Sequence, residues 1–220
     1  VGPVTWGMTV TDNLQKAIAY DEVLADACAK LLKLKTGWME NELQKISPNT
    51  IIFVDEPYLS SFGSSFFALS KEKVVSLLEE VLSGIKGLKG VHCCGNTDWS
   101  LLLGTSIDIL SLDAFEFAES LSLYPREVKD FIERGGAVSW GIVPTEEKAL
   151  EKETVSSLLD RLEDAMAPLT RQAAGIPFRR LIVQGLLTPS CGLARLSPEA
   201  AGKALELLAD LSAKIRSRWG

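Results

Sequence analysis

The stretch GVHCCGNTDWSLLLGTSIDILSLDAFE, residues 90–116, indicates the fold class on its own. Two β-rich apolar runs, Gly90–Cys94 and Ile107–Leu112, flank a polar loop and a short apolar segment, Trp99–Leu103, that suits a helix. A strand, a helix and a second strand in this order form the repeating unit of a parallel sheet covered by helices. The stretch therefore predicts an α/β protein.

The same alternation continues on both sides of this stretch. The further strand candidates are Pro3–Trp6, Thr50–Asp55, Ala137–Ile142 and Leu181–Leu186. Apolar residues at helical spacing predict long helices within residues 14–32, 74–85, 155–166 and 201–211. The first of these helices is marked by Leu14, Ala17, Ile18, Leu24, Ala27, Leu31 and Leu32.

Local signals set the expected ends of several helices. Ser70 and Ser197 are the expected N-caps of two of the long helices. A shorter helix should begin at Pro125 and end before Gly135, because proline suits the first helical position and glycine the position after the last. Pro168 should kink or end the helix that contains it.

The number of units bears on whether the sheet closes. A (β/α)8 barrel of the triosephosphate isomerase (TIM) type requires eight strand–helix units and about 250 residues. The 220 residues of this chain supply six strand candidates. We expect a TIM-type barrel in which the first two units are missing, since the chain enters a strand candidate directly without an initial Met. Residues 1–220 then form one catalytic barrel domain that is incomplete at its N-terminus, with an open doubly wound sheet as the alternative.

The composition is that of an ordinary globular chain, with 46% hydrophobic and 24% charged residues. The formal net charge of −6 and the lack of a Lys/Arg run give no sign of nucleic-acid binding. The most apolar region, Leu101–Ala118, is interrupted by acidic residues, so no membrane span is expected. Without a signal-peptide pattern, the chain is expected in the cytoplasm. Its four cysteines are expected as reduced thiols or metal ligands.

Polar residues gather where the predicted strands end, which is the edge that carries the active site in parallel α/β proteins. His92, the one histidine, and Cys94 are two positions apart, so strand alternation turns both to the same side. Glu116 and Cys191 follow two other strand candidates and are expected at the same edge. One nitrogen, two sulfurs and a carboxylate oxygen form a ligand set that zinc accepts. The alternative is a packed histidine among buried cysteines.

This ligand set favours the activation of a thiol over that of water. Two thiolates and a carboxylate keep a bound sulfur electron-rich, and metal ligation removes the proton of a substrate thiol near neutral pH. Hydrolytic zinc sites more often contain several histidines, and this chain has one.

Other residues near the strand ends are candidates for binding a substrate. Asp55 is expected to hold an ammonium group by a charge-assisted hydrogen bond, with a loop or helix cap as its alternative role. Glu56 could contact the substrate or only fix the loop. Trp140 and Trp6 could line the pocket or pack in the core.

Two cysteines and one loop have other expected roles. Cys93 should point away from its two neighbours into the packing between strand and helix, and Cys28 in the first long helix is also interpreted as structural. The segment Tyr58–Leu69, rich in Ser, Gly and Phe, could cover the pocket as a mobile lid.

Five motifs, taken in order along nearly the whole chain, suggest a family. They are Gly2-Pro3-Val4-Thr5, Ile51-Ile52-Phe53-Val54-Asp55-Glu56-Pro57, His92-x-Cys94, Glu116 placed 22 positions after Cys94, and Pro189-Ser190-Cys191-Gly192-Leu193. Together they resemble the catalytic C-terminal half of cobalamin-independent methionine synthase. The chain is similar to the short core type of this enzyme, within the superfamily of uroporphyrinogen decarboxylase and methionine synthase.

The resemblance implies a (β/α)8 barrel and a zinc ion held by His92, Cys94, Glu116 and Cys191. It also implies homocysteine as the thiol, with Asp55 at its amino group. The run from His92 to Thr97 is more similar to corrinoid-using methyltransferases than to the folate enzyme. We therefore expect a zinc-dependent methyltransferase that forms methionine and takes the methyl group from a methylated corrinoid protein.

Three alternatives stay open from the sequence. Coenzyme M or another thiol could replace homocysteine as the acceptor. Methyl-tetrahydrofolate could replace the methyl-corrinoid as the donor. The four ligand residues could also form a structural zinc site or a thiol-sensing module without catalysis.

Overall fold

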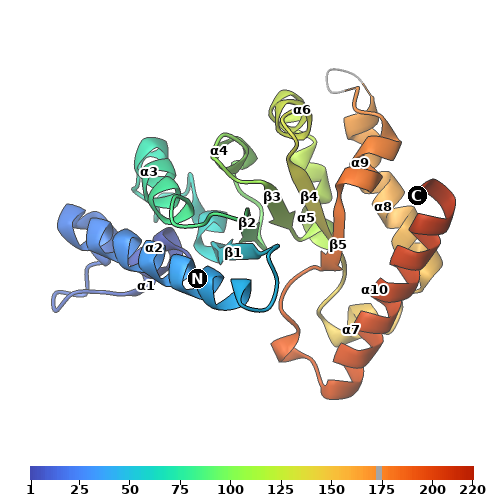
Figure 1. Cartoon of the computed structure of the whole chain (residues 1–220), viewed down its shortest axis with the longest axis horizontal. Coiled ribbons are helices and arrows are strands. Elements are labelled where there is room, and N and C mark those ends of the chain that lie inside the picture. Colours follow the sequence, from blue (N-terminus) through green and yellow to red (C-terminus); the bar gives the residue numbers. More distant parts are fainter. Residues whose placement is uncertain (172–174) are drawn as a thin grey trace. The chain divides into compact units, whose positions relative to one another are not determined.

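The computed structural model describes residues 1–171 and 175–220. The described part divides into two compact units, Val1–Leu110 and Ser111–Gly220. In each unit helices flank strands, as the ribbon shows (Figure 1). The predicted α/β class is therefore confirmed, while the prediction of a single domain over residues 1–220 stays a prediction.

The described strands are ordered β1-β2-β3-β4-β5 in a five-stranded sheet, which is also their order along the chain. β1 (Ile51–Asp55) pairs in parallel with β2 (Leu88–Cys93), and β4 (Ala137–Val143) pairs in parallel with β5 (Leu186–Pro189). β3 (Ile109–Leu112) is fully buried. Because β1 and β5 are the two edges of this sheet, it is open, and the structure does not confirm the closed barrel.

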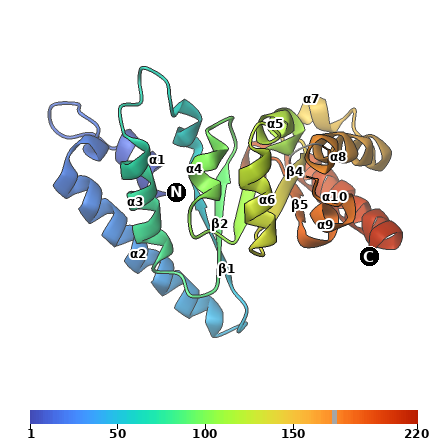
Figure 2. The same cartoon turned by 90° about the horizontal axis from the view of Figure 1, so that it is seen from above.

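The first unit contains several helices besides β1 and β2. They are α1 (Pro3–Thr9), η1 (Ile18–Tyr20), α2 (Glu22–Gln44), η2 (Pro57–Ser61), α3 (Lys71–Leu82) and α4 (Trp99–Leu103). The long helices α2 and α3 lie side by side (Figure 2). The side chain of Asp21 accepts hydrogen bonds from two backbone N–H groups and begins α2. Ser70 caps α3 in the same way, as the sequence predicts.

The second unit contains the remaining helices. They are α5 (Ala114–Leu121), α6 (Pro125–Glu133), α7 (Glu147–Leu150), α8 (Val155–Thr170), α9 (Phe178–Gln184), η3 (Leu193–Arg195) and α10 (Pro198–Trp219). Ser197 caps α10 as predicted. Gly135, with φ +98°, follows α6 in the left-handed conformation that glycine tolerates. Pro168 lies inside α8, which ends two residues later at Thr170.

Two of the six predicted strands are wrong. Pro3–Trp6 lies in α1, because Pro3 begins a helix whose backbone N–H groups find an acceptor far along the chain, in Glu56. The segment Leu181–Leu186 divides between α9 and the first residue of β5. Gly185 separates these two elements in an extended conformation, so the apolar run belongs to two structures.

The first long helix also differs from the prediction. It begins at Glu22, so Leu14, Ala17 and Ile18 lie outside it, and its buried face is formed by Ala25, Cys28, Ala29, Leu32, Thr36 and Glu40. Leu24, Ala27 and Leu31, which the apolar pattern grouped with Leu32, are exposed.

Candidate metal centre

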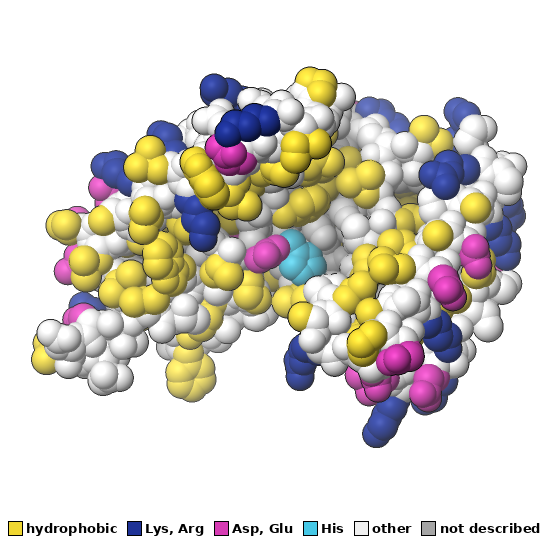
Figure 3. Space-filling view, turned by 60° about the horizontal axis from the view of Figure 1, so that its bottom comes forward, with side chains coloured by type: hydrophobic (Ala, Val, Ile, Leu, Met, Phe, Trp, Pro, Cys, Tyr) yellow, Lys and Arg dark blue, Asp and Glu magenta, His cyan; other side chains and the backbone are white. Residues whose placement is uncertain are grey.

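The carboxyl ends of β1 and β2 place an acidic side chain beside the single histidine. Asp55 and His92 are partners in the parallel register of these strands, and Asp55 is exposed. The histidine reaches the surface in the space-filling view, next to an acidic side chain (Figure 3). Burial lowers the pKa of His92, and the charge of Asp55 partly opposes that shift. A lowered pKa keeps the imidazole neutral near pH 7, which is the form that binds metals.

The two adjacent cysteines that follow His92 differ in burial. Cys94 is half-buried, whereas the side chain of Cys93 is fully buried and donates a hydrogen bond to the carbonyl oxygen of Gly95 at 3.5 Å. Burial raises the pKa of Cys93 to about 12, so its thiol keeps its proton. The structural role predicted for Cys93 agrees with this burial. Cys28 is buried as well, and burial also raises its pKa.

In the second unit, Cys191 is exposed in the loop after β5. The loop is fixed by its neighbour Ser190, whose N–H donates to the carbonyl oxygen of Val143 at 2.8 Å. The hydroxyl of Ser190 also lies 3.3 Å from that of Thr145. Gly141 permits this approach, because a Cβ there would lie 2.8 Å from the Cα of Ser190. These contacts define the position of Cys191 relative to the end of β4.

Glu116 lies in the first turn of α5, where its N–H donates to the capping carboxylate of Asp113 at 3.0 Å. Burial raises the pKa of Asp113 to about 6, and the charge of Glu116 adds to this rise. The side chain of Glu116 is exposed and lines, with Cys191 and Thr145, a cavity of about 540 Å³ in the second unit. Glu116 and Cys191 therefore share a cavity.

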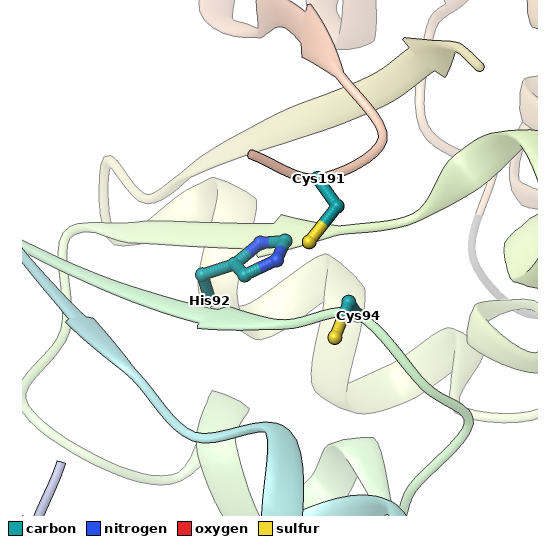
Figure 4. A group of neighbouring side chains, drawn as sticks. All are labelled: His92, Cys94 and Cys191. Carbon is teal, nitrogen blue, oxygen red and sulfur yellow. The ribbon is translucent and has the colours of Figure 1, made fainter. Parts of the chain in front are cut away.

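Three of the four predicted ligands form a group that could hold a metal ion. His92, Cys94 and Cys191 each offer one ligand atom, and these atoms lie within 4.8 Å of one another (Figure 4). Imidazole nitrogen and two sulfurs are donors that zinc accepts at distances of about 2.0–2.3 Å. Glu116 lies outside this group. Its role as the fourth ligand stays a prediction.

Glu56, a predicted substrate-binding residue, contacts the first helix. Its role in substrate binding stays a prediction. Its carboxyl group is fully buried and accepts hydrogen bonds from the N–H of Val4 (2.8 Å), the N–H of Thr5 (2.7 Å) and the hydroxyl of Thr5 (2.6 Å). Both oxygens therefore accept hydrogen bonds within the protein. Burial raises the pKa of Glu56 to about 7, against the opposing effect of these hydrogen bonds.

Of the aromatic candidates and the proposed lid, Trp140 and two lid residues are buried. Trp140 is 1% exposed in β4, and its indole N–H has no hydrogen-bond partner within the described residues. Trp6 is half-buried in α1. In the segment Tyr58–Leu69, Leu59 and Phe67 are buried. The core-packing alternative thus describes Trp140, and mobility of the segment stays a prediction.

Sequence reasoning missed the hydroxyl pair that fixes the Cys191 loop. Thr145 lies two positions after β4 and Ser190 directly after β5, so the rule that functional residues gather at strand ends could have found both.

Neither models of known protein families nor the curated proteins contain a match to this chain. Within the part of the chain that the structure describes, no helix combines the length and the apolar character needed to cross a membrane.

Proposed function

We propose that this chain is a zinc-dependent methyltransferase that transfers a methyl group to the thiolate of homocysteine and so forms methionine. The observation that carries the proposal is the group of ligand atoms from His92, Cys94 and Cys191 within 4.8 Å of one another. In this proposal they hold the zinc ion, and Glu116 supplies the fourth ligand before substrate arrives.

The donor set fits zinc better than a magnesium or calcium ion, which prefer oxygen ligands. When bound, zinc supplies a positive charge that lowers the pKa of a coordinated substrate thiol. Coordination also fixes the position of the substrate sulfur. A metal held by protein through three residues leaves a further position for the substrate sulfur, as catalytic zinc sites do. The exposure of Cys191 supports access to that position.

The remaining residues would bind and orient the acceptor. Asp55 is an exposed carboxylate at the end of β1, in register with His92, and can receive the ammonium group of homocysteine. The thiol proton leaves to solvent. The thiolate sulfur then attacks the methyl carbon, so that a sulfur–carbon bond forms while the bond between the methyl group and the donor breaks. The bonding electron pair stays on the donor.

The donor we propose is a methylated corrinoid protein, on the similarity of residues 92–97 to corrinoid-using enzymes. The sequential order of the strands is also that of a (β/α)8 barrel, and we propose that the open sheet is an arc of such a barrel. We also propose that the protein is located in the cytoplasm.

The decisive experiment measures zinc content and the zinc-edge X-ray absorption spectrum before and after homocysteine is added. One zinc ion per chain and a new zinc–sulfur contact with homocysteine are expected. A zinc ion whose ligands do not change would instead indicate a structural site. A chain that binds no stoichiometric zinc would contradict the proposal.

A pair of adjacent cysteines provides the matched control. Cys94→Ala should abolish stoichiometric zinc binding, since it removes one of three grouped ligands. Cys93→Ala should retain the zinc ion, because the buried Cys93 is not in that group. Circular dichroism of both variants checks that each is folded.

A further inference from the structure

Two of the four cysteines lie close enough to react with each other. Cys94 and Cys191 are free thiols, and their sulfur atoms lie within 4.8 Å of one another in the group that also contains the imidazole of His92 (Figure 4). A disulfide bond joins two sulfurs at about 2.05 Å, and two sulfurs on one tetrahedral zinc ion lie about 3.8 Å apart. The two side chains therefore need only a short closing movement to be joined.

The loop after β5 has room for this movement. Cys191 is exposed and lines the cavity of about 540 Å³ in the second unit. A Cβ placed on the next residue, Gly192, would meet no atom of the described residues within 4 Å, so the backbone on this side of Cys191 has open space beside it. On the other side, Ser190 is held by the hydrogen bond from its N–H to Val143. Cys191 can thus shift while β5 stays in place.

Burial separates this pair from the other two cysteines. Cys93 is 0% exposed and Cys28 6%, whereas Cys94 is half-buried and Cys191 is exposed. Oxidants attack thiols that solvent reaches, and a second thiol close to the first converts the primary product into a disulfide. Cys191 is placed for the first of these reactions and Cys94 for the second. Cys93 is adjacent to Cys94 in the sequence but is shielded from solvent.

We propose that Cys94 and Cys191 form a disulfide bond when the protein meets a hydroperoxide. The Cys191 thiolate first attacks one oxygen of the peroxide, so that a sulfur–oxygen bond forms, the oxygen–oxygen bond breaks, and the leaving oxygen takes up a proton. The sulfur of Cys94 then attacks the sulfenic acid on Cys191, so that the sulfur–sulfur bond forms and the sulfur–oxygen bond breaks. The hydroxide leaves as water with the proton of Cys94. With hydrogen peroxide, two thiols are oxidised and one peroxide molecule is reduced to two water molecules.

The disulfide inactivates the metal centre. It removes two of the three grouped ligands, because a sulfur in a disulfide has no thiolate charge to give to a metal ion. His92 alone remains of the group. Metal and oxidant thus compete for the same two sulfurs, so bound zinc should slow the oxidation and the oxidation should release zinc. Only this competition rests on the proposed function, since the disulfide itself forms without metal.

Treatment of the metal-free full chain with hydrogen peroxide tests the disulfide. Of the four thiols per chain, two should remain after oxidation, and the intact mass should fall by the mass of two hydrogen atoms. Dithiothreitol should restore all four thiols, which separates a disulfide from over-oxidised sulfur. A non-reducing gel should show a monomer, since the bond lies within one chain. Four remaining thiols, or a loss of thiols only through linked dimers, would overturn the proposal.

Substitution of each adjacent cysteine identifies the partner of Cys191. Cys93→Ala should lose two of its three thiols, as the unchanged protein loses two of its four. Cys94→Ala should form no disulfide within the chain. The reverse result would assign the bond to Cys93 and refute the proposed pair. Circular dichroism checks that both metal-free variants are folded.

Oxidation in guanidinium chloride is the control for the folded geometry. All four cysteines are accessible in the unfolded chain, so mixed pairings are expected there. The same single pairing in the unfolded chain would show that the folded structure does not select it, against the proposal.

Oxidation of the zinc-loaded protein tests the competition. The reaction should be roughly tenfold or more slower than that of the metal-free protein, because only the metal-free fraction reacts. Metal analysis after desalting should show one zinc ion lost for each disulfide formed. Zinc that stays on the oxidised protein, or a rate that zinc does not change, would exclude the competition. A chain that binds no zinc at the start contradicts the proposed function, and the metal-free experiment still decides whether the disulfide forms.

Discussion

The carboxyl group of Glu56 accepts a hydrogen bond from the backbone N–H of Thr5 at 2.7 Å, although 51 positions separate the two residues. The same carboxyl receives the N–H of Val4 and the hydroxyl of Thr5. The first turn of α1 is therefore held by a side chain from the end of β1. This contact connects the start of the chain to the strand end that carries Asp55.

Replacing the carboxyl group should cost stability. In Glu56→Ala, two N–H groups and one hydroxyl lose their buried acceptor, and we expect the free energy of unfolding to fall by about 3 kcal/mol. Urea denaturation followed by circular dichroism measures this change. Glu42→Ala is the control, because Glu42 pairs with Lys45 at the surface, and its loss should cost no more than about 0.5 kcal/mol. Equal effects of the two substitutions would refute the anchoring role of Glu56.

The stability of the protein should also depend on pH through Glu56. Burial raises its pKa from 4.5 to about 7 in the folded protein. The stability that the neutral carboxyl contributes is thus fully present below about pH 4.5 and is lost as the pH rises through about 7. The free energy of unfolding should fall between pH ~5 and pH ~8, and less steeply in Glu56→Gln, which has no proton to lose. Identical slopes in both proteins would show that Glu56 does not titrate in this range.

The charge of Asp55 should be detectable at the imidazole of His92. Because that charge raises the pKa of His92 against the effect of burial, Asp55→Asn should lower the pKa further. NMR titration of the metal-free protein is unambiguous, since the chain has one histidine.

The same substitution tests the proposed substrate contact. Asp55→Asn should raise the KM for homocysteine at least tenfold and leave the zinc content unchanged. Asp26→Asn, which alters only an exposed ion pair, should change neither quantity. Full activity of Asp55→Asn would separate Asp55 from the binding of the amino group and would favour a thiol without one, such as coenzyme M.

The loop that carries Cys191 should be sensitive to a single added methyl group. In Gly141→Ala, the new Cβ would clash with the carbonyl oxygen of Leu112 and lie 2.8 Å from the Cα of Ser190, so the backbone of β3 or of the loop must shift. We expect a loss of about 2 kcal/mol in stability and a lower affinity for zinc. Gly202→Ala in α10 is the control, because a Cβ there meets nothing within 4 Å. It should stabilise the protein by up to about 1 kcal/mol. Calorimetry and zinc titration of both variants measure these effects.

The sequence pattern predicted structure correctly where residues close in sequence determine it. Alternation along β2 correctly separated the buried Cys93 from the half-buried His92 and Cys94. Hydrophobic runs located β1 and β4, and the caps at Ser70 and Ser197 were correct. Each of these features depends on residues within a few positions.

Contacts between distant residues explain the errors. Pro3–Trp6 forms a helix because Glu56 supplies the acceptors for its first N–H groups, and no local pattern contains that information. The face of α2 that packs could not be read from periodicity, since both of its faces are apolar.

The attachment of α1 to Glu56 limits which residues of this helix can be removed. Deleting residues 3–5 would take away the donors to a buried acid. The backbone N–H of that acid donates to the carbonyl oxygen of His92 at 2.8 Å. A change in the first turn of α1 would thus reach the strand that presents the imidazole, through a single buried side chain.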